Sequence, residues 1–454
     1  MKKVIQPYLL RAISSDVLRD GRRKFHRLLR RLTNRKACIN VYLKVDDPYS
    51  YLLVQALPSI EKRFNVEFSA NVIYSLQEDM FPEPELWAKH ALVDANYVAS
   101  LYHFKFLPHP NKSQSAIDVA HYDAYAIHLQ DRIDQGDSWQ ALLRIFEDYW
   151  QSRNANEPYR QMKQSKNADA LKIKLKENSN SLSQQGHYLP ATLYFEGEWY
   201  WGVDRLCHLE ERLLHENLGK LPTIHVVFDR SYLNIQSSII HNAALPSVKV
   251  ENVPPIELFW SARSPYSYIA LYKAIYLANA YGVPLNVKPV LPMMMRGLDV
   301  PKKKALYIFL DTTREARKLG IEYGFVADPL GPGVERCYSL LRFARERGRY
   351  LEYLLAFAQG VNAKGIRADT NEGMKRIVEQ AGLNWTEAKC HLSDSHWKEE
   401  VVSNQQEMYA FGNWGVPIFR YKNTMVWGQD RMYVIERELR DAMRTSPVSI
   451  HQLD

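Results

Sequence analysis

Three short motifs occur twice in this chain, in the same order and at similar spacing. The first copy consists of Pro48-Tyr49-Ser50-Tyr51, a proline (Pro190) before a strand-like run, and Trp201-Gly202-Val203-Asp204-Arg205. The second copy consists of Pro265-Tyr266-Ser267-Tyr268, Pro417 and Trp427-Gly428-Gln429-Asp430-Arg431. An ordered repeat of this kind indicates two halves with one architecture, and we interpret it as a tandem duplication.

Within each half, the residue pattern predicts a strand, a tight turn and a helix that begins with proline. In the second half the strand is 256–260 and the corner is Ser264-Pro265, and in the first half they are 39–45 and Asp47-Pro48. Proline fits the first helical position because an N–H there has no intrahelical partner. Another strand follows each helix, so each half begins with a right-handed βαβ unit. Helical stretches then precede a closing pair of strands and a last helix.

These patterns predict an α/β fold with two tandem domains. We expect residues 1–36 to form a basic amphipathic helix, 37–230 the first domain, 231–254 a polar linker and 255–445 the second domain. In each domain a helical insertion separates a βαβ part from a ββα part.

The positive net charge of the chain is concentrated at its N-terminus. The sequence has 59 basic and 51 acidic side chains, and 12 of the basic ones lie in residues 1–36. The remaining 47 basic and 49 acidic side chains leave the body of the protein close to neutral. The high pI therefore gives no reason to expect nucleic-acid binding by the folded domains.

Apolar residues in the basic N-terminal segment recur at helical spacing, which predicts an amphipathic helix that is interrupted or bent near Gly21. One interpretation is attachment to an anionic membrane surface or an acidic partner. A second is packing on the body of the protein with a solvated basic face. A third is an Arg-rich organelle presequence, against which Asp16 and Asp20 count.

The cysteines are few and far apart. None of Cys38, Cys207, Cys337 and Cys390 forms a Cys-x-x-Cys pair, so neither a dithiol redox motif nor a compact zinc site is predicted. Reduced thiols fit a cytoplasmic protein, and no apolar run is long enough to span a bilayer. We expect Cys337 and Cys390 to be buried. The Met293-Met294-Met295 run is expected to pack in the core, and the alternative is that it lines an apolar substrate pocket.

Both halves resemble the thioredoxin-fold group that contains DsbA-like proteins, kappa-class glutathione transferases and 2-hydroxychromene-2-carboxylate isomerases. The resemblance extends over nearly the whole chain after residue 37. It is sharpest in Ser264-Pro265-Tyr266-Ser267-Tyr268, Gly415-Val416-Pro417 and Trp427-Gly428-Gln429-Asp430-Arg431. It implies two thioredoxin-like domains of the DsbA/kappa type, with glutathione bound where the βαβ and ββα parts meet.

The resemblance also implies roles for individual residues of the second half. Ser264 is the expected catalytic residue, whose hydroxyl donates to the glutathione thiolate while the helix N-terminus favours the negative charge. Pro417 looks like the family's cis-proline, which lets the Val416 backbone pair with the cysteinyl part of glutathione. Asp430 is expected to accept from the γ-glutamyl ammonium, and the N–H groups of Gln429 and Asp430 to hold its carboxylate.

Lys304 lies roughly where the family places a lysine near the glycyl end of glutathione.

Each of these residues also has a structural interpretation. A Ser-Pro pair at a helix start is commonly only a cap, and the Val416-Pro417 and Asp430-Arg431 elements serve as a turn and a helix start that the fold needs.

The first half departs from the pattern at its helix corner. Asp47 stands where the second half has Ser264, so a carboxylate would face any bound thiolate and raise the thiol pKa. Aspartate is also an excellent helix cap, which is a sufficient structural reason for it. We expect a degenerate domain that packs against the active one in place of a partner subunit. A homodimer of the whole chain is a further alternative.

Together these features predict a cytoplasmic glutathione-dependent isomerase or transferase that acts on a small apolar electrophile. Its chemistry is expected in the second half, without a metal, and peripheral contact with a membrane surface through residues 1–36 stays open. One alternative is a non-catalytic binding or scaffold protein. Another is a relative of the thiol oxidoreductases, which the missing Cys-x-x-Cys disfavours.

Overall fold

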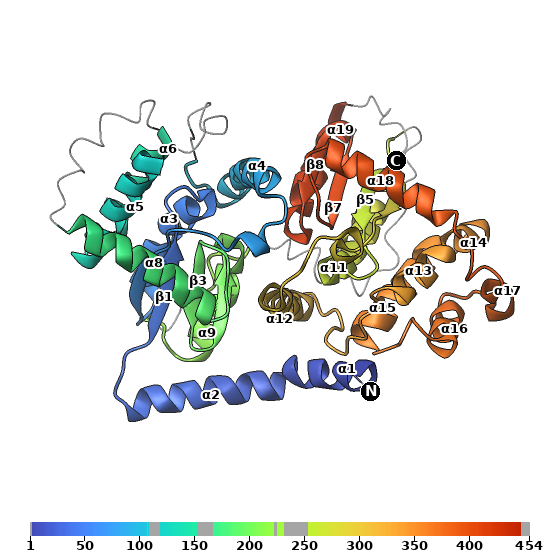
Figure 1. The fold of residues 1–454 in the computed structure, drawn as a ribbon, viewed down its shortest axis with the longest axis horizontal. Helices are drawn as coiled ribbons and strands as arrows, with labels where there is room; N and C mark the ends of the chain where they lie inside the picture. The colour runs from blue at the N-terminus through green and yellow to red at the C-terminus, as the bar shows by residue number, and fades with distance from the viewer. Residues whose placement is uncertain are drawn as a thin grey trace, which may run out of the picture. The chain divides into compact units, whose positions relative to one another are not determined.

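Two four-stranded sheets organise the chain, one in each half (Figure 1). The structure, a computed structural model, describes residues 2–106, 108, 119–151, 167–221, 225–230 and 253–445. An N-terminal unit comprises Arg19–Ser231 with Pro301–Tyr307, and a C-terminal unit comprises Met1–Leu18, Tyr232–Val300 and Ile308–Asp454. The predicted domain limits stay predictions, and all but the last two residues of the predicted linker 231–254 lie outside the described residues.

The sheet of the N-terminal unit has the strand order β2-β1-β3-β4, with β2 parallel and β3 antiparallel to β1, and β4 antiparallel to β3. The helix α3 (Pro48–Arg63) joins the two parallel strands and completes the predicted βαβ unit. The strands are β1 (Cys38–Leu43), β2 (Glu67–Val72), β3 (Thr192–Phe195) and β4 (Glu198–Trp201). The other elements of this unit are η1 (Glu78–Met80), α4 (Pro84–Tyr102), α5 (Val119–Asp134), α6 (Trp139–Gln151), α8 (Ala168–Gln184), η3 (Val203–Arg205) and α9 (Leu206–His215).

The sheet of the C-terminal unit has the corresponding order β6-β5-β7-β8, with the same directions. Its strands are β5 (Ile256–Trp260), β6 (Leu285–Pro289), β7 (Ile418–Tyr421) and β8 (Thr424–Trp427). The helices are α11 (Pro265–Tyr281), η4 (Met293–Arg296), α12 (Lys302–Lys318), α13 (Pro332–Ser339), α14 (Leu341–Glu346), α15 (Tyr350–Ala363), α16 (Asn371–Gln380), α17 (Trp385–Lys389), α18 (Trp397–Ala410), η5 (Gln429–Arg431) and α19 (Met432–Thr445). The first part of α12, residues 302–307, belongs to the N-terminal unit.

Helices α11 and α19 pack against the sheet of the C-terminal unit and against each other. The core side chains of β5 and α11 are fully buried, among them Leu258, Phe259, Ile269 and Leu271. Helices α13 to α17 form most of the insertion between the parallel and the antiparallel parts of this sheet, as the sequence predicts (Figure 1).

The basic N-terminal segment differs from its prediction. It forms two helices, α1 (Lys2–Ile13) and α2 (Asp16–Leu32), which are separated at Ser14–Ser15 and not bent at Gly21. The second helix begins there because Ser15 Oγ accepts a hydrogen bond from Leu18 N at 3.3 Å. Within the described residues, no helix combines the length and the apolar character that crossing a bilayer requires.

Two expectations about the core are also corrected. Cys337 is fully buried as predicted, but Cys390 is exposed, because α17 ends beside it on the surface of the insertion. The Met293-Met294-Met295 run forms η4, none of whose residues is buried in this chain.

Two glycine-to-alanine substitutions should have opposite effects on stability. A Cβ at Gly415 would lie 2.4 Å from Trp427 Cζ2, and that ring packs 4.6 Å from Trp414. Because the ring must shift, we expect Gly415→Ala to destabilise by about 1–3 kcal/mol. Gly21 has nothing within 4 Å of an added Cβ and lies inside α2, so Gly21→Ala should stabilise that helix by up to about 1 kcal/mol. Thermal unfolding of both variants tests the pair, and a neutral Gly415→Ala would contradict the packing.

Candidate functional site

The corner between β5 and α11 presents a serine hydroxyl at a helix N-terminus. Ser264 is the N-cap of α11, and its Oγ accepts a hydrogen bond from Ser267 N at 3.2 Å. The turn before it is closed by a hydrogen bond from Ser264 N to Ser261 O at 3.1 Å. Ser264 is partly exposed, and within the described chain its hydroxyl proton has no acceptor. The hydroxyl can therefore donate to a ligand.

The register of the sheet brings the three motifs of the second half to one end of neighbouring strands. Phe259 of β5 pairs with Ile418 of β7, and Ile418 pairs with Trp427 of β8. Because these pairings are antiparallel, the residues after β5, before β7 and after β8 lie at the same end of the sheet. Gly428 N donates to Pro417 O at 2.9 Å and ties two of the motifs together.

In the loop before β7, the main-chain polar groups of Val416 have no partner within the described residues. The Val416–Pro417 peptide bond is cis, as the sequence resemblance implied. Val416 is partly exposed, and neither its N–H nor its C=O makes a hydrogen bond within the described chain. One donor and one acceptor of the main chain are therefore available at the same end of the sheet as the serine corner.

Gln429 and Asp430 lie in η5, directly before α19. The side chain of Gln429 is buried, and its Nε2 donates to Glu315 Oε2 at 2.9 Å and also to Asp430 Oδ1. Lys273 Nζ donates to Gln429 O at 3.0 Å and to its side-chain oxygen. The Gln429 side chain thus fixes η5 to α11 and α12, and Asp430 stays partly exposed next to it.

Sequence reasoning missed Lys273 and Glu315, which hold this end of the site. Lys273 is the only charged residue between Pro265 and Tyr281. A single lysine in an otherwise uncharged helix could have been recognised as a residue with a specific partner. Glu315 gave no such signal, because it lies in a stretch with many charged residues.

Lys304 belongs to a different unit from the other predicted site residues. It groups with the N-terminal unit, whereas Ser264, Val416, Pro417, Gln429 and Asp430 belong to the C-terminal unit. Its Nζ donates to Met80 O at 2.7 Å, and burial lowers the pKa of Lys304 from 10.5 to about 8. Its role toward glutathione stays a prediction without structural support.

The corner of the N-terminal unit has the same hydrogen bonds around a different cap. Asp47 Oδ2 accepts from Ser50 N and from Ser50 Oγ, both at 2.7 Å, and Lys44 N donates to Ser50 Oγ as Ser261 N does to Ser267 Oγ. Tyr49 OH donates to Asp94 at 2.8 Å. In the other unit Tyr266 OH donates to Asp311 at 2.7 Å. The corner belongs to the fold, and only the cap side chain differs.

The predicted correspondence of Pro190 with Pro417 is wrong by one residue. Thr192 pairs with Trp201 as Ile418 pairs with Trp427, so Ala191 occupies the position of Pro417. Ala191 has φ +53°, and its carbonyl accepts from Gly202 N at 2.8 Å, as that of Pro417 does from Gly428 N. The sequence comparison aligned the two prolines because it matched residue types and could not see the strand register.

Side chains fill the region before Ala191 in the N-terminal unit. Tyr307 is buried in a cluster with Met80, Tyr188 and Leu189, and its ring centroid lies 4.5 Å from that of His187. The segment Pro301–Tyr307 therefore covers the place that corresponds to the Val416 loop. This packing favours a structural role for the first half.

No metal site accompanies these residues. Among the described residues, no three His, Cys, Asp or Glu side chains come close enough together to hold a metal ion.

Comparison with known proteins finds a family model that matches most of the C-terminal half. Residues 255–440 match the family model described as DSBA-like thioredoxin domain. A solved structure of 2-hydroxychromene-2-carboxylate isomerase is similar, with 21% identity over 42% of this chain and 97% of that chain and a TM-score of 0.37. A probable DsbA oxidoreductase from Streptomyces coelicolor is similar with 21% identity over 42% and 91% of the two chains and a TM-score of 0.34. No curated protein matches the sequence.

The buried cap of the N-terminal unit should make stability depend on pH. Burial raises the pKa of Asp47 from 3.8 to about 7, and the hydrogen bonds from Ser50 offset part of this effect. The folded state then binds the proton more tightly than the unfolded state, so this contribution is complete below about pH 4 and is lost as the pH rises to about 7. We expect Asp47→Asn, which keeps a capping oxygen, to raise Tm at pH 8 and to leave it nearly unchanged at pH 4.

Thermal unfolding across this pH range checks the prediction. Asp46→Asn is the matched control, because it removes an adjacent carboxylate that pairs with Lys44 and caps nothing. Equal effects of Asp47→Asn at both pH values would contradict the assignment.

Proposed function

Because residues 255–440 form a DsbA-like thioredoxin domain, we propose that this domain is a glutathione-dependent isomerase or transferase. Its substrate would be a small apolar electrophile. The observation that carries the proposal is the meeting of a donor hydroxyl, Ser264, with the unpaired Val416 peptide group at one end of the sheet.

The available groups fit a thiol tripeptide. The main-chain N–H and C=O of Val416 can pair with the cysteinyl residue of glutathione as a short strand would. The Ser264 hydroxyl and the N-terminus of α11 offer a hydrogen bond and a positive dipole end to a sulfur anion. The Asp430 carboxylate already accepts from Gln429 Nε2, and because it is partly exposed we propose that it also accepts from an ammonium group.

When bound, glutathione would supply a thiolate as the nucleophile. Ser264 then lowers the thiol pKa by donating to sulfur, and the α11 dipole acts in the same direction. The buried Gln429 side chain keeps η5 in place, so that Asp430 and the Val416 loop stay at a fixed separation. These residues orient the thiol and stabilise its charge, and none of them needs to change its own protonation state.

The N-terminal unit is proposed to be a degenerate copy without this activity. The equal strand orders and the matching corner hydrogen bonds support a tandem duplication. The Asp47 cap, the Ala191 position and the Tyr307 side chain all differ from the proposed active domain in ways that disfavour a bound thiolate. The free cysteines of both units fit a cytoplasmic location.

Replacement of Ser264 should separate binding from thiol activation. We expect Ser264→Ala to bind glutathione within several-fold of the wild type by calorimetry, because Val416 and Asp430 are unchanged. Bound glutathione should show thiolate ultraviolet absorbance with the wild type at neutral pH and lose most of it with the variant. Loss of a single preorganised donor commonly costs about 10²-fold in rate.

The matched control is Thr370→Ala, which removes another side-chain cap of the same unit. Thr370 Oγ1 accepts from Gly373 N at 3.1 Å at the start of α16, away from the site motifs in sequence. It should lose similar stability and keep the thiolate signal. Absence of glutathione binding by the wild type would overturn the enzyme and favour a binding or scaffold protein.

A further inference from the structure

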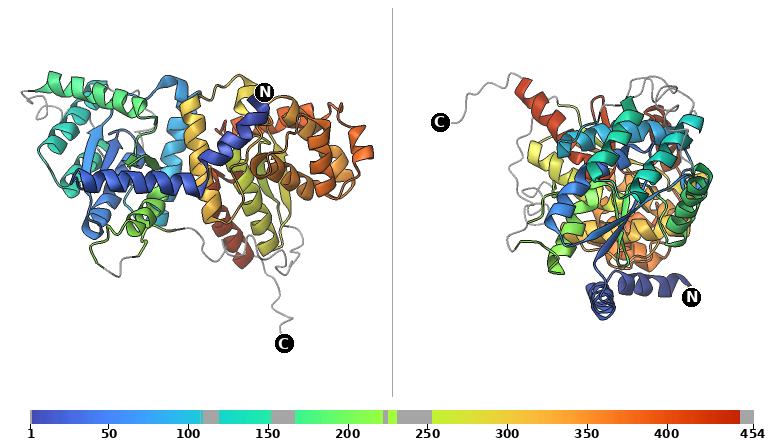
Figure 2. Two further views of the ribbon diagram at one scale, coloured as in Figure 1. Left: turned by 90° about the horizontal axis from the view of Figure 1, so that it is seen from below. Right: turned by 90° about the vertical axis from the view of Figure 1, so that its left-hand side faces the viewer.

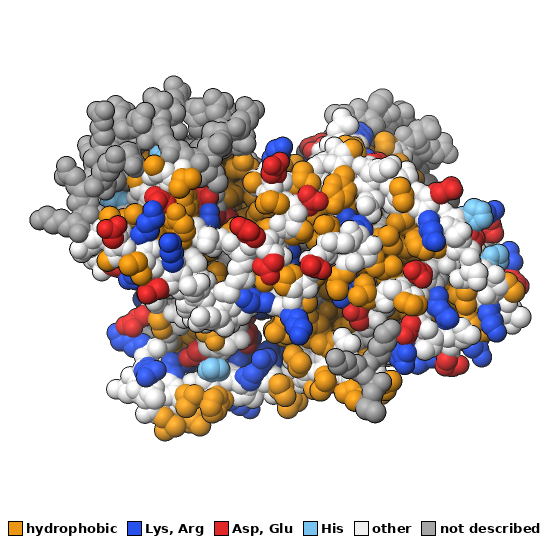
Figure 3. Space-filling view, viewed as in Figure 1, with side chains coloured by type: hydrophobic (Ala, Val, Ile, Leu, Met, Phe, Trp, Pro, Cys, Tyr) orange, Lys and Arg blue, Asp and Glu red, His pale blue; other side chains and the backbone are white. Residues whose placement is uncertain are grey.

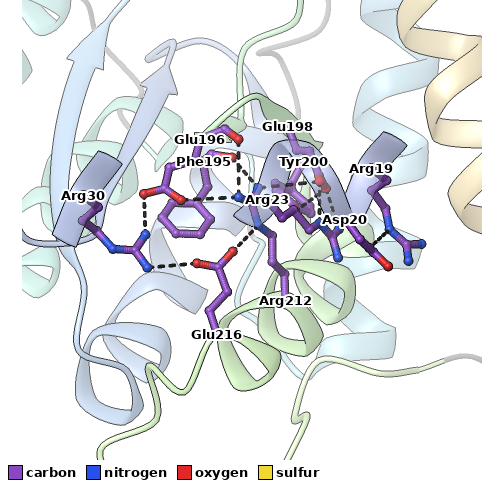
Figure 4. A network of polar contacts seen from close by, with 10 residues as sticks. All are labelled: Arg19, Asp20, Arg23, Arg30, Phe195, Glu196, Glu198, Tyr200, Arg212 and Glu216. Atoms are coloured by element: carbon purple, nitrogen blue, oxygen red, sulfur yellow. Dashed lines mark hydrogen bonds and ion pairs between the residues drawn. The ribbon is translucent and has the colours of Figure 1, made fainter. Parts of the chain in front are cut away.

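The amphipathic helix α2 packs on the N-terminal unit through its charged face. Arg23 makes a two-point contact with Glu198, with N···O distances of 2.6 and 2.7 Å (Figure 4). Arg30 reaches Glu216 Oε2 at 3.0 Å and also pairs with Glu196. These arginines lie on one side of α2, two helical turns apart, so ion pairs at both points hold that side against the unit.

A buried arginine, Arg212, holds the glutamates that pair with α2. The side chain of Arg212 on α9 is inaccessible to solvent, and its Nε donates to Glu216 Oε1 at 2.9 Å. Its guanidinium also donates to the Phe195 carbonyl at 2.6 Å and lies over the Phe195 ring (Figure 4). The unit therefore offers α2 a preorganised acidic surface, and the apolar side of the helix has no comparable surface to pack on.

The opposite side of α2 carries its apolar residues, and they point into solvent. In the view from below, α2 runs in front of the unit and no described element covers it (Figure 2). In the space-filling view, hydrophobic side chains gather along the bottom of the picture, where Figure 1 shows α2 (Figure 3). The stripe consists of Val17, Leu18, Phe25, Leu28, Leu29 and Leu32, whose exposed fractions are 85%, 47%, 59%, 55%, 42% and 73%.

Basic residues border this apolar stripe on both sides. At 100° per residue, Lys24 and Arg31 fall on one border of the stripe and Arg22 on the other. All three are exposed, and none makes an ion pair within the described part of the chain. An apolar stripe between basic borders is the pattern of a helix that lies in the plane of a lipid interface.

We propose that α2 docks the N-terminal unit on an anionic lipid surface. The stripe would enter the boundary between headgroups and acyl chains, and Arg22, Lys24 and Arg31 would contact lipid phosphates and carboxylates. The polar side of a free interfacial helix faces water. In this chain the polar side of α2 instead contacts the acidic residues of the unit. Because the apolar stripe is exposed and has basic residues on both borders, its charge is complementary to that of an anionic lipid layer. The proposal is independent of the proposed glutathione chemistry.

Sedimentation of the full chain with vesicles tests the proposal. We expect the chain to pellet with phosphatidylcholine vesicles that contain about a third phosphatidylserine. The pelleted fraction should fall about tenfold or more with pure phosphatidylcholine vesicles, and likewise at high salt. Phe25→Ser/Leu28→Ser/Leu32→Ser should lose pelleting by a similar factor. These side chains are exposed, so the variant should keep the Tm of the wild type.

A second triple variant controls for loss of exposed apolar area in general. Val93→Ser/Val119→Ser/Ile173→Ser removes three exposed side chains from other helices of the unit and should pellet like the wild type. Arg22→Gln/Lys24→Gln/Arg31→Gln should abolish the dependence on phosphatidylserine.

Three results would overturn the proposal. The first is a wild type that stays in solution with anionic vesicles. The second is pelleting that survives removal of the apolar stripe. The third is a wild type that does not bind vesicles but forms a dimer in light scattering, together with a stripe variant that is monomeric. That result would assign the stripe to contact with a second copy of this chain.

Discussion

The antiparallel pairing of β7 with β5 is the constraint on which the candidate site depends. Ser264, the Val416 loop and η5 are far apart in sequence, and none of them forms a site alone. Their meeting follows from two register pairs, Phe259 with Ile418 and Ile418 with Trp427. A shift of one residue would turn every side chain of the strand to the other face and separate Arg420 from Glu257, with which it forms an ion pair. This pair therefore supports the register and with it the site.

Comparison of the two units separates what the fold requires from what the chemistry would require. Both keep a capped helix that begins with proline, a serine that accepts from the backbone three residues before the cap, and a tyrosine–aspartate hydrogen bond. These groups are therefore structural. Two of the differences are the cap, where Asp47 replaces Ser264, and the strand start, where Ala191 replaces Pro417. A ligand site that needs both positions can exist only in the C-terminal unit.

The sequence predicted what local chemistry determines. Caps, turns and apolar periodicity located both corners and all eight strands that the structure describes, because these signals lie within a few residues of one another. It misaligned Pro190, since register is decided across strands. It did not anticipate the support from Glu315, which reaches Gln429 from a different helix. Burial of the Asp47 carboxylate was equally invisible, because its surroundings come from distant parts of the chain.

Helix α2 shows the same limit in another form. Its periodicity predicts an amphipathic helix but does not say which side faces the protein. Usually the apolar side does, because burial of apolar area stabilises. Here Glu216 and Arg212 are already buried, and a buried carboxylate with too few partners costs several kcal/mol, on the order of 3–5 when a pair is broken. Arg30 supplies Glu216 with a further partner. Since the ion pairs use the charged side of α2, its apolar side remains exposed, and this exposed stripe is the basis of the proposed lipid contact.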